Sequence, residues 1–175
     1  MTLKLKRTPG LYLVGFMACG KSTVGRMLAG ELGWCFIDID AEIEATEGQT
    51  IEQIFQERAE AGFRDLETKM IRARVSRIEC GLPCVVALGG GALLKPDNWE
   101  LVENNGVTVW LDCPFQVIQA RLGTGSGRPL ASNGTNLAAL FENRRPTYER
   151  ADFRIVVENS DVQEIVLKIL ELPIF

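Results

Sequence analysis

The amino-acid sequence predicts an α/β protein in which a five-stranded, mostly parallel sheet is flanked by helices. Five short apolar runs alternate with longer segments of helical period, and a glycine-rich loop directly follows the first run. Because parallel strands need crossover connections, this alternation predicts β-α-β units with binding sites at the carboxyl ends of the strands. A chain of 175 residues suits one domain with a single core.

Composition places the chain among ordinary soluble proteins. Hydrophobic residues make up 46% and charged residues 24%, and the formal charge of −4 argues against a nucleic-acid-binding face. No apolar run is long enough for a membrane span and the N-terminal segment is too polar for a signal peptide, so we expect a cytoplasmic protein. The five cysteines include no C-x-x-C pair and histidine is absent, which indicates reduced thiols rather than a metal site.

The five predicted strands are apolar and short enough to be buried on both faces of the sheet. They span residues 11–14, 35–39, 84–88, 107–111 and 153–157. The segments between them are expected to be helices. Residues 123–136 are rich in Gly, Ser and Asn, which predicts a mobile loop with Arg128 in its middle.

The first strand leads into GFMACGKST, residues 15–23, which fits the phosphate-binding P-loop pattern G-x-x-x-x-G-K-[ST]. The glycines let the backbone turn its N–H groups inward, and the helix that follows directs its positive dipole end at the same phosphates. Lys21 supplies a positive charge and Ser22 offers a hydroxyl to Mg²⁺. A glycine-rich turn that caps a helix is the simpler alternative. The loop residues expected to bind ATP are Gly15, Ala18, Cys19, Gly20, Lys21, Ser22 and Thr23.

The second strand ends in FIDID, at the carboxyl edge of the sheet. Two residues apart on a strand, Asp38 and Asp40 would share a face, so one could serve a metal ion and the other a substrate. Capping of the next helix is the simpler alternative. The guanine-reading N-K-x-D motif is absent and no aspartate is followed by glycine three residues later, which argues against a GTP-driven switch.

The next helix begins with a predicted capping box at Thr50 and Gln53, and Gly62 is expected to break it. Arg64 follows, with Glu67 three residues later to hold the guanidinium in place. A solvated surface pair is the simpler alternative for this arginine.

The third strand leads into LGGGA, where Gly89, Gly90 and Gly91 are expected to expose backbone amides beyond what a tight turn requires. Later, LFENRRPTYERADF predicts an arginine-rich helix that Pro146 should end or kink. Such a helix face is usually solvated. Around one phosphate site, however, Arg144, a second arginine, an aspartate and a glycine turn would form a receptor for a small hydroxylated carboxylic acid, which is a phosphoryl acceptor.

Over nearly its whole length the chain resembles the shikimate kinase family. The motifs that carry the resemblance are, in order, GFMACGKST, DID, TIEQIF with FRDLE, LGGGA, RLGTGSGRPL and RRPTYERAD. The resemblance implies a P-loop NTPase fold of the nucleoside monophosphate kinase type, with a substrate-binding insertion at about 40–70 and a lid at about 123–136. It also implies ATP-dependent phosphorylation of the 3-hydroxyl of shikimate in aromatic amino acid (chorismate) biosynthesis, by a monomer that uses Mg²⁺.

The resemblance implies roles for the acceptor-binding residues. Arg64 and Arg144 would grip the carboxylate, while Asp40 would meet the ring hydroxyls with help from the backbone at Gly90. Asp40 would also orient or deprotonate the attacking hydroxyl. The full set of expected acceptor-binding residues is Asp40, Arg64, Gly89, Gly90, Gly91 and Arg144.

For the nucleotide, the resemblance implies that Ser22, supported by Asp38, holds Mg²⁺, that Arg128 closes on the phosphates and that Arg121 lies against adenine. The expected catalytic residues are Lys21, Asp40 and Arg128. Another small-molecule kinase, such as a gluconate or nucleotide kinase, and a non-catalytic nucleotide-binding relative are the alternatives. No nucleic acid or membrane partner is expected.

The chain departs from the family pattern in a few places. Ala59 stands where the family usually has glycine, and Thr147 where leucine is common. Cys19 varies the interior of the P-loop. Beside Lys21 and a helix N-terminus, this thiol is expected to be unusually acidic and open to alkylation that ATP blocks.

Overall fold

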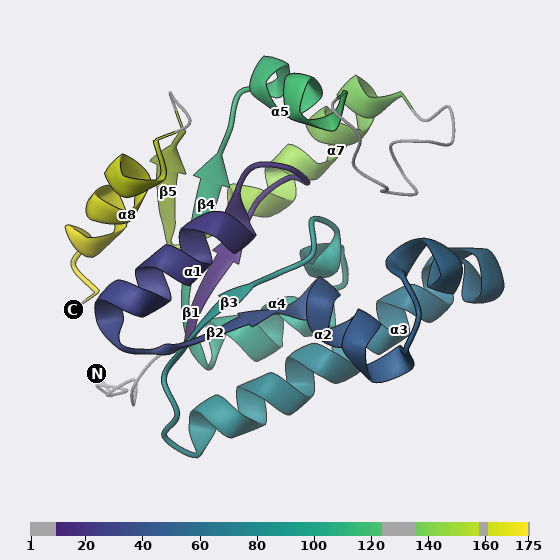
Figure 1. The fold of residues 1–175 in the computed structure, drawn as a ribbon, viewed down its shortest axis with the longest axis horizontal. Helices are drawn as coiled ribbons and strands as arrows, with labels where there is room; N and C mark the ends of the chain where they lie inside the picture. The colour runs from purple at the N-terminus through teal and green to yellow at the C-terminus, as the bar shows by residue number, and fades with distance from the viewer. Residues whose placement is uncertain (1–9, 124–135, 158–160, 175) are drawn as a thin grey trace.

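The computed structural model describes residues 10–123, 136–157 and 161–174. Five strands, all paired in parallel, form one sheet with the order β2-β3-β1-β4-β5 (Figure 1). The strands are β1 Gly10–Val14, β2 Cys35–Asp38, β3 Cys84–Ala87, β4 Gly106–Asp112 and β5 Phe153–Val156. The predicted sheet is therefore confirmed, and β1, which leads into the glycine-rich loop, lies at its centre.

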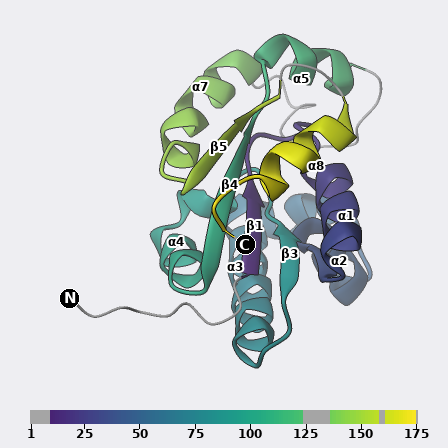
Figure 2. The ribbon, with the colours of Figure 1, turned by 90° about the vertical axis from the view of Figure 1, so that its left-hand side faces the viewer.

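Helices cover both faces of the sheet. They are α1 Lys21–Leu32, α2 Ile39–Glu47, α3 Ile51–Glu79, the 3₁₀ helix η1 Ala92–Leu94, α4 Pro96–Glu103, α5 Phe115–Leu122, α7 Leu137–Tyr148 and α8 Val162–Leu170. Figure 2 shows α1 and α8 on one side of the sheet and α4 and α7 on the other. Within the described part of the chain, none of these helices combines the length and the apolar character that crossing a bilayer demands.

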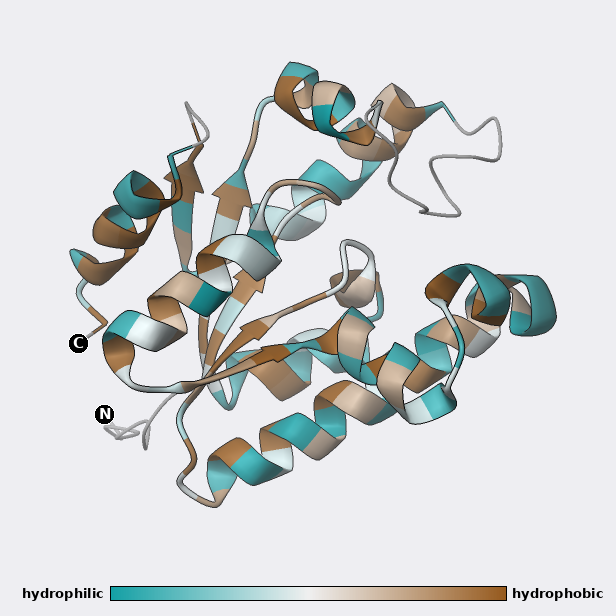
Figure 3. Ribbon diagram, viewed as in Figure 1, coloured by the Kyte–Doolittle hydropathy of each residue, from teal (hydrophilic) through white to brown (hydrophobic). Residues whose placement is uncertain are grey.

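Burial follows the position of each strand in the sheet. β1 and β3 are buried along their whole length and β4 along nearly all of it, whereas β2 and β5 are partly exposed. The expectation that every strand is buried on both faces is wrong for β2 and β5 because they form the two edges. The resulting apolar core is visible as the brown centre of Figure 3, with the polar exterior of α2 and α3 beside it.

The start of α3 has the predicted capping box, in which the Gln53 N–H donates to Thr50 Oγ1 and the Thr50 N–H donates to Gln53 Oε1. The helix is interrupted at Ala59, with φ 56° and ψ −177°, rather than at Gly62 as expected. Gly62 stays helical. Its role is to make room across the kink, because a Cβ there would lie 2.6 Å from the Cβ of Arg58.

Two cysteines sit opposite each other on neighbouring strands. Cys35 begins β2 and is in register with Cys84, which begins β3, and the two are joined by a disulfide with their Cα atoms 4.6 Å apart. The expectation of five reduced thiols is therefore wrong for this pair. Cys19, Cys80 and Cys113 are free thiols.

Candidate active site

The loop between β1 and α1 borders a cavity of about 620 Å³. Lys21 is buried there, and its Nζ donates to the carbonyl oxygens of Gly15 and Phe16 at 2.9 Å each. Gly15 and Gly20 have φ of 139° and 103°, which side-chain-bearing residues rarely adopt. A Cβ on Gly15 would also lie 2.8 Å from the carbonyl oxygen of Leu111. The loop therefore has the turn and the helix N-terminus that bind phosphate groups.

Asp38 connects β2 to α2 and uses both carboxylate oxygens. Oδ2 accepts a hydrogen bond from the Ser22 hydroxyl. Oδ1 accepts from the backbone N–H groups of Asp40 at 3.1 Å and of Ala41 at 3.3 Å, so Asp38 is the N-cap of α2. The expectation that Asp38 and Asp40 share one face of a strand is wrong because the strand ends at Asp38 and Asp40 belongs to the first turn of α2. Both residues nevertheless line the cavity.

The Ser22–Asp38 contact is the part of the site that fits a metal ion. A hydroxyl and a carboxylate are the hard oxygen ligands that Mg²⁺ takes, together with water and substrate phosphates. Among the described residues there is no group of three or more acidic, cysteine or histidine side chains that could hold a metal by itself. This corner would therefore hold Mg²⁺ with help from a nucleotide.

One residue from outside contacts the loop, and one residue within it lies close to Lys21. Arg121 of α5 donates from Nη1 to the carbonyl oxygen of Ala18 at 2.9 Å and also lines the cavity. Cys19 Sγ lies 3.7 Å from Lys21 Nζ, as the sequence suggested, but Cys19 is only 1% exposed. Burial argues against reaction of this thiol, although Cys19 lines the cavity, and its alkylation stays a prediction.

Gly89, Gly90 and Gly91 form a glycine wall between the P-loop and the two arginines Arg64 and Arg144, and they are needed for space. A Cβ on Gly89 would lie 2.3 Å from Glu67 Oε1 and 2.9 Å from Asp40 Oδ1. A Cβ on Gly91 would lie 2.3 Å from Arg64 Nη2. Neither glycine has a positive φ. Close approach of side chains, rather than turn geometry, therefore explains them.

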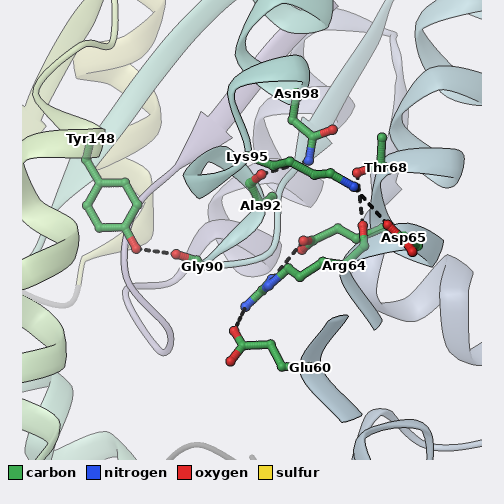
Figure 4. Close-up of polar contacts among 10 residues, drawn as sticks. Glu60, Arg64, Asp65, Thr68, Gly90, Ala92, Lys95, Asn98 and Tyr148 are labelled. Carbon is green, nitrogen blue, oxygen red and sulfur yellow. Dashed lines mark hydrogen bonds and ion pairs between the residues drawn. The ribbon is translucent and has the colours of Figure 1, made fainter. Parts of the chain in front are cut away.

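The middle glycine brings the P-loop and α7 together. A Cβ on Gly90 would lie 3.1 Å from the backbone nitrogen of Met17 and 3.6 Å from Arg144 Nη1. The Tyr148 hydroxyl donates to the Gly90 carbonyl oxygen (Figure 4). This contact exists because α7 continues through Pro146 to Tyr148, so of the expectation that Pro146 ends or kinks the helix, the ending is wrong.

Arg64 is held by two carboxylates. Its Nη1 lies 2.7 Å from Glu67 Oε2 and its Nη2 lies 3.1 Å from Glu60 Oε1 (Figure 4). Burial lowers the pKa of Arg64, but the two carboxylates outweigh burial and the net pKa is raised. The guanidinium carbon also lies 5.2 Å from the centre of the Phe63 ring. The predicted Arg64–Glu67 contact is confirmed.

Glu67 is fully buried at 0% exposure, and its Oε1 has no hydrogen-bond partner. Burial raises the pKa of this carboxyl to about 7; Arg64 opposes the rise and the negative charge of Asp40 adds to it. Burial therefore favours the protonated form of this carboxyl more than in an exposed glutamate.

Arg144 is the second buried guanidinium, with 3% exposure. Its Nε has no hydrogen-bond partner, and within the described part of the chain no carboxylate forms an ion pair with it. The guanidinium carbon lies 5.7 Å from the centre of the Phe16 ring. Burial lowers the pKa of Arg144, and the charge of Arg64 lowers it further, against the effects of Tyr148 and Glu60.

The other arginines of this region lie elsewhere. Arg145 is 3.5 Å from Asp112, and Arg150 is 3.2 Å from Glu103. Arg128 and most of the predicted lid lie outside the described residues. Two contacts were not predicted, those of Glu60 and Tyr148. The Glu60 contact has a signal in the sequence, since Glu60 is four residues before Arg64 and on the same helix face. The Tyr148 contact has none, because it joins α7 to Gly90 from a distant part of the sequence.

A model of the family described as shikimate kinase matches residues 17–173. The chain belongs to the shikimate kinase family. It is 43% identical to the shikimate kinase of Persephonella marina over 161 residues, covering 91% of this chain and 96% of that protein. It is 40% identical to the shikimate kinase of Synechococcus elongatus over 166 residues, covering 93% and 85%.

The solved structures agree with this assignment. A shikimate kinase from Acinetobacter baumannii in complex with shikimate superposes with a TM-score of 0.88 at 36% identity, covering 95% of this chain and 93% of that one. A gluconokinase from Sinorhizobium meliloti superposes with a TM-score of 0.58 at 22% identity and shares the fold alone. The expected P-loop kinase fold of the nucleoside monophosphate kinase type is thereby confirmed, and the family distinguishes this kinase from the gluconate and nucleotide kinases that the motifs had left as alternatives.

Proposed function

We propose that the cavity beside the P-loop transfers the γ-phosphoryl group of ATP to the 3-hydroxyl of shikimate, giving shikimate 3-phosphate and ADP. One observation carries the acceptor assignment. The buried guanidinium of Arg144 has no carboxylate partner in the described part of the chain, and it lies beside Gly90, which lines the same cavity as the P-loop.

A buried cation without a partner is costly unless a ligand completes it. The carboxylate of a ring acid would supply the missing negative charge, held between the forked N–H donors of Arg144 and Arg64. The absence of side chains on Gly89 and Gly91 lets Asp40 and Arg64 approach the end of β3, where the ring would bind next to those donors. Asp40 lines the cavity and would accept hydrogen bonds from ring hydroxyls.

The nucleotide phosphates would bind the N–H groups of the P-loop and the start of α1. Lys21 now donates to two loop carbonyls, and it would turn its Nζ towards the β- and γ-phosphates. Catalysis would then rest on positioning and on neutralisation of the charge that develops on the transferring group. Asp40 would orient the attacking hydroxyl and accept its proton. Arg121 would contact the base, and Arg128 would add positive charge.

Mg²⁺ would be held by the Ser22 hydroxyl with support from Asp38, and it would neutralise charge on the phosphates. We also propose residues 40–70 as the acceptor-binding insertion and residues 123–136 as the lid. All candidate groups come from one chain, which supports a monomer, and we place the enzyme in the cytoplasm.

A coupled assay of ADP release with shikimate, quinate, gluconate and nucleoside monophosphates tests the proposal. Turnover with shikimate and none with the nucleotides is expected. Turnover of gluconate or a nucleotide in place of shikimate would overturn it. Asp38→Asn should raise the Mg²⁺ concentration needed for half-maximal rate, while Asp97→Asn, on the distant α4, should not.

A further inference from the structure

Arg64 has two carboxylate partners that differ sharply in their exposure to solvent. Glu67 is 2.7 Å from Nη1 and its side chain is 0% exposed, whereas Glu60 is 3.1 Å from Nη2 and its side chain is 51% exposed. Figure 4 shows the Glu60 carboxylate at the outer end of the guanidinium. Because water screens an exposed ion pair, the Glu60 contact is weak. Arg64 thus has one permanent partner and one exchangeable partner.

Negative charge already lies near the two acceptor arginines when no acceptor is bound. Glu67 and Glu60 face Arg64, and the negative charge of Glu60 also raises the pKa of Arg144. An acceptor carboxylate would bring a further negative charge to this pocket, where Asp40 already raises the pKa of Glu67. Of the two carboxylates on Arg64, Glu60 is the one exposed to water and therefore the one that an acceptor carboxylate can displace.

The backbone allows Glu60 to leave without moving Arg64. Glu60 directly follows Ala59, where positive φ interrupts α3, so it begins the helical segment that carries Arg64. In an uninterrupted helix a side chain lies back over the preceding turn. Here the kink removes that turn, and the Glu60 side chain can swing into solvent while Glu67 keeps Arg64 in place.

We propose that Glu60 is an internal anion that occupies Arg64 in the empty acceptor site and is displaced by the carboxylate of shikimate. Glu60 then acts as a specificity-determining residue, because an acceptor must bind both arginines well enough to replace it. The inference rests on the proposed function, since it takes Arg64 and Arg144 as the acceptor's binding groups.

The test compares Glu60→Gln with the matched control Glu57→Gln. Glutamine keeps a hydrogen-bond acceptor for Arg64 and removes only the charge, and Glu57 lies one turn earlier, 2.8 Å from Gln49 rather than from an arginine. The measurements are the KM for shikimate, the KM for ATP, kcat, and the Ki of cyclohex-1-ene-1-carboxylate, which has the ring acid without hydroxyls. Calorimetric titration with shikimate in the absence of ATP gives the dissociation constant directly.

Glu60→Gln should lower the KM and Kd for shikimate and the Ki for the ring acid by about two- to fivefold, the range expected for an exposed ion pair. The KM for ATP and kcat should change less than about twofold, and Glu57→Gln should change nothing by more than that. An increase in the shikimate KM would show that Glu60 orients Arg64 in the complex, and no change would show that Glu60 stays in place; either result overturns the inference. If the wild type does not phosphorylate shikimate at all, the proposed function fails instead.

Discussion

Replacing Arg144 by methionine is expected to stabilise the protein and abolish acceptor binding in the same variant. Arg144 is 3% exposed, its Nε has no hydrogen-bond partner, and burial lowers its pKa. These properties are typical of a side chain that binds a ligand and does not stabilise the fold. Methionine has nearly the same length and flexibility but no polar hydrogens to satisfy.

The magnitude follows from these contacts. Removing a buried unpaired donor relieves about 1–3 kcal/mol, and losing the cation–π contact with the Phe16 ring costs about 0.5–1 kcal/mol. The net gain of up to about 2.5 kcal/mol should raise Tm by as much as roughly 10 °C for a chain of this length. Loss of two charge-assisted hydrogen bonds to the acceptor, worth about 1.5–3 kcal/mol each, should raise the KM for shikimate at least about 10²-fold.

Thermal unfolding of the ligand-free variant and the coupled ADP-release assay measure the two effects. The control is Arg150→Met, because Arg150 is 54% exposed, pairs with Glu103 at 3.2 Å and stacks on Trp99, away from the glycine wall. That variant should gain no stability and keep its shikimate KM within about twofold. A lower Tm for Arg144→Met, or a shikimate KM within about threefold of the wild type, would refute the reasoning.

Three further outcomes are expected. The pKa of Glu67 is about 7 in the folded state against 4.5 without burial, so its contribution to stability is lost as the pH rises from about 4.5 to 7. The stability of Glu67→Gln relative to the wild type should therefore be greater at pH 8 than at pH 4.5. Urea unfolding measures this difference in stability, and an equal difference at both pH values would contradict the prediction. Ala59→Gly should stabilise the protein by about 1 kcal/mol, because it relieves about 1–3 kcal/mol of backbone strain and adds a smaller entropy cost. The control Ala61→Gly, in regular helix, should destabilise the protein by about the same amount. Equal losses of stability in the two variants would rule out strain at Ala59. Gly91→Ala should raise the shikimate KM about tenfold without changing the KM for ATP, because the added Cβ would displace Arg64. An unchanged shikimate KM would show that Arg64 does not bind the acceptor.

The sheet and the P-loop could be predicted because each is specified by local sequence. Short apolar runs such as 84–88 are typical of buried strands. The spacing of Gly15, Gly20 and Lys21 is set by the backbone turn of the P-loop itself. The Arg64–Glu67 pair could also be predicted, since three residues on a helix bring two side chains together.

The errors arose where tertiary contacts decide the outcome. The disulfide between Cys35 and Cys84 forms because β2 lies beside β3, and this pairing cannot be predicted from the sequence of either strand. The kink falls at Ala59 and not at Gly62, and Gly62 instead allows Arg58 to pack closely across the kink. These arrangements depend on strand order and on packing between elements, which no single segment encodes.

The glycine wall limits how this scaffold can change its acceptor. A Cβ added at Gly89 or Gly91 would lie less than 3.0 Å from side chains of α2 or α3, and one added at Gly90 would lie 3.1 Å from the P-loop backbone. Adaptation to a ring of another size or charge therefore cannot proceed by single substitutions of these three glycines. Evolution or design would have to work from the opposite side, through exchanges in α3 and α7, while the strand end and its bare backbone stay fixed.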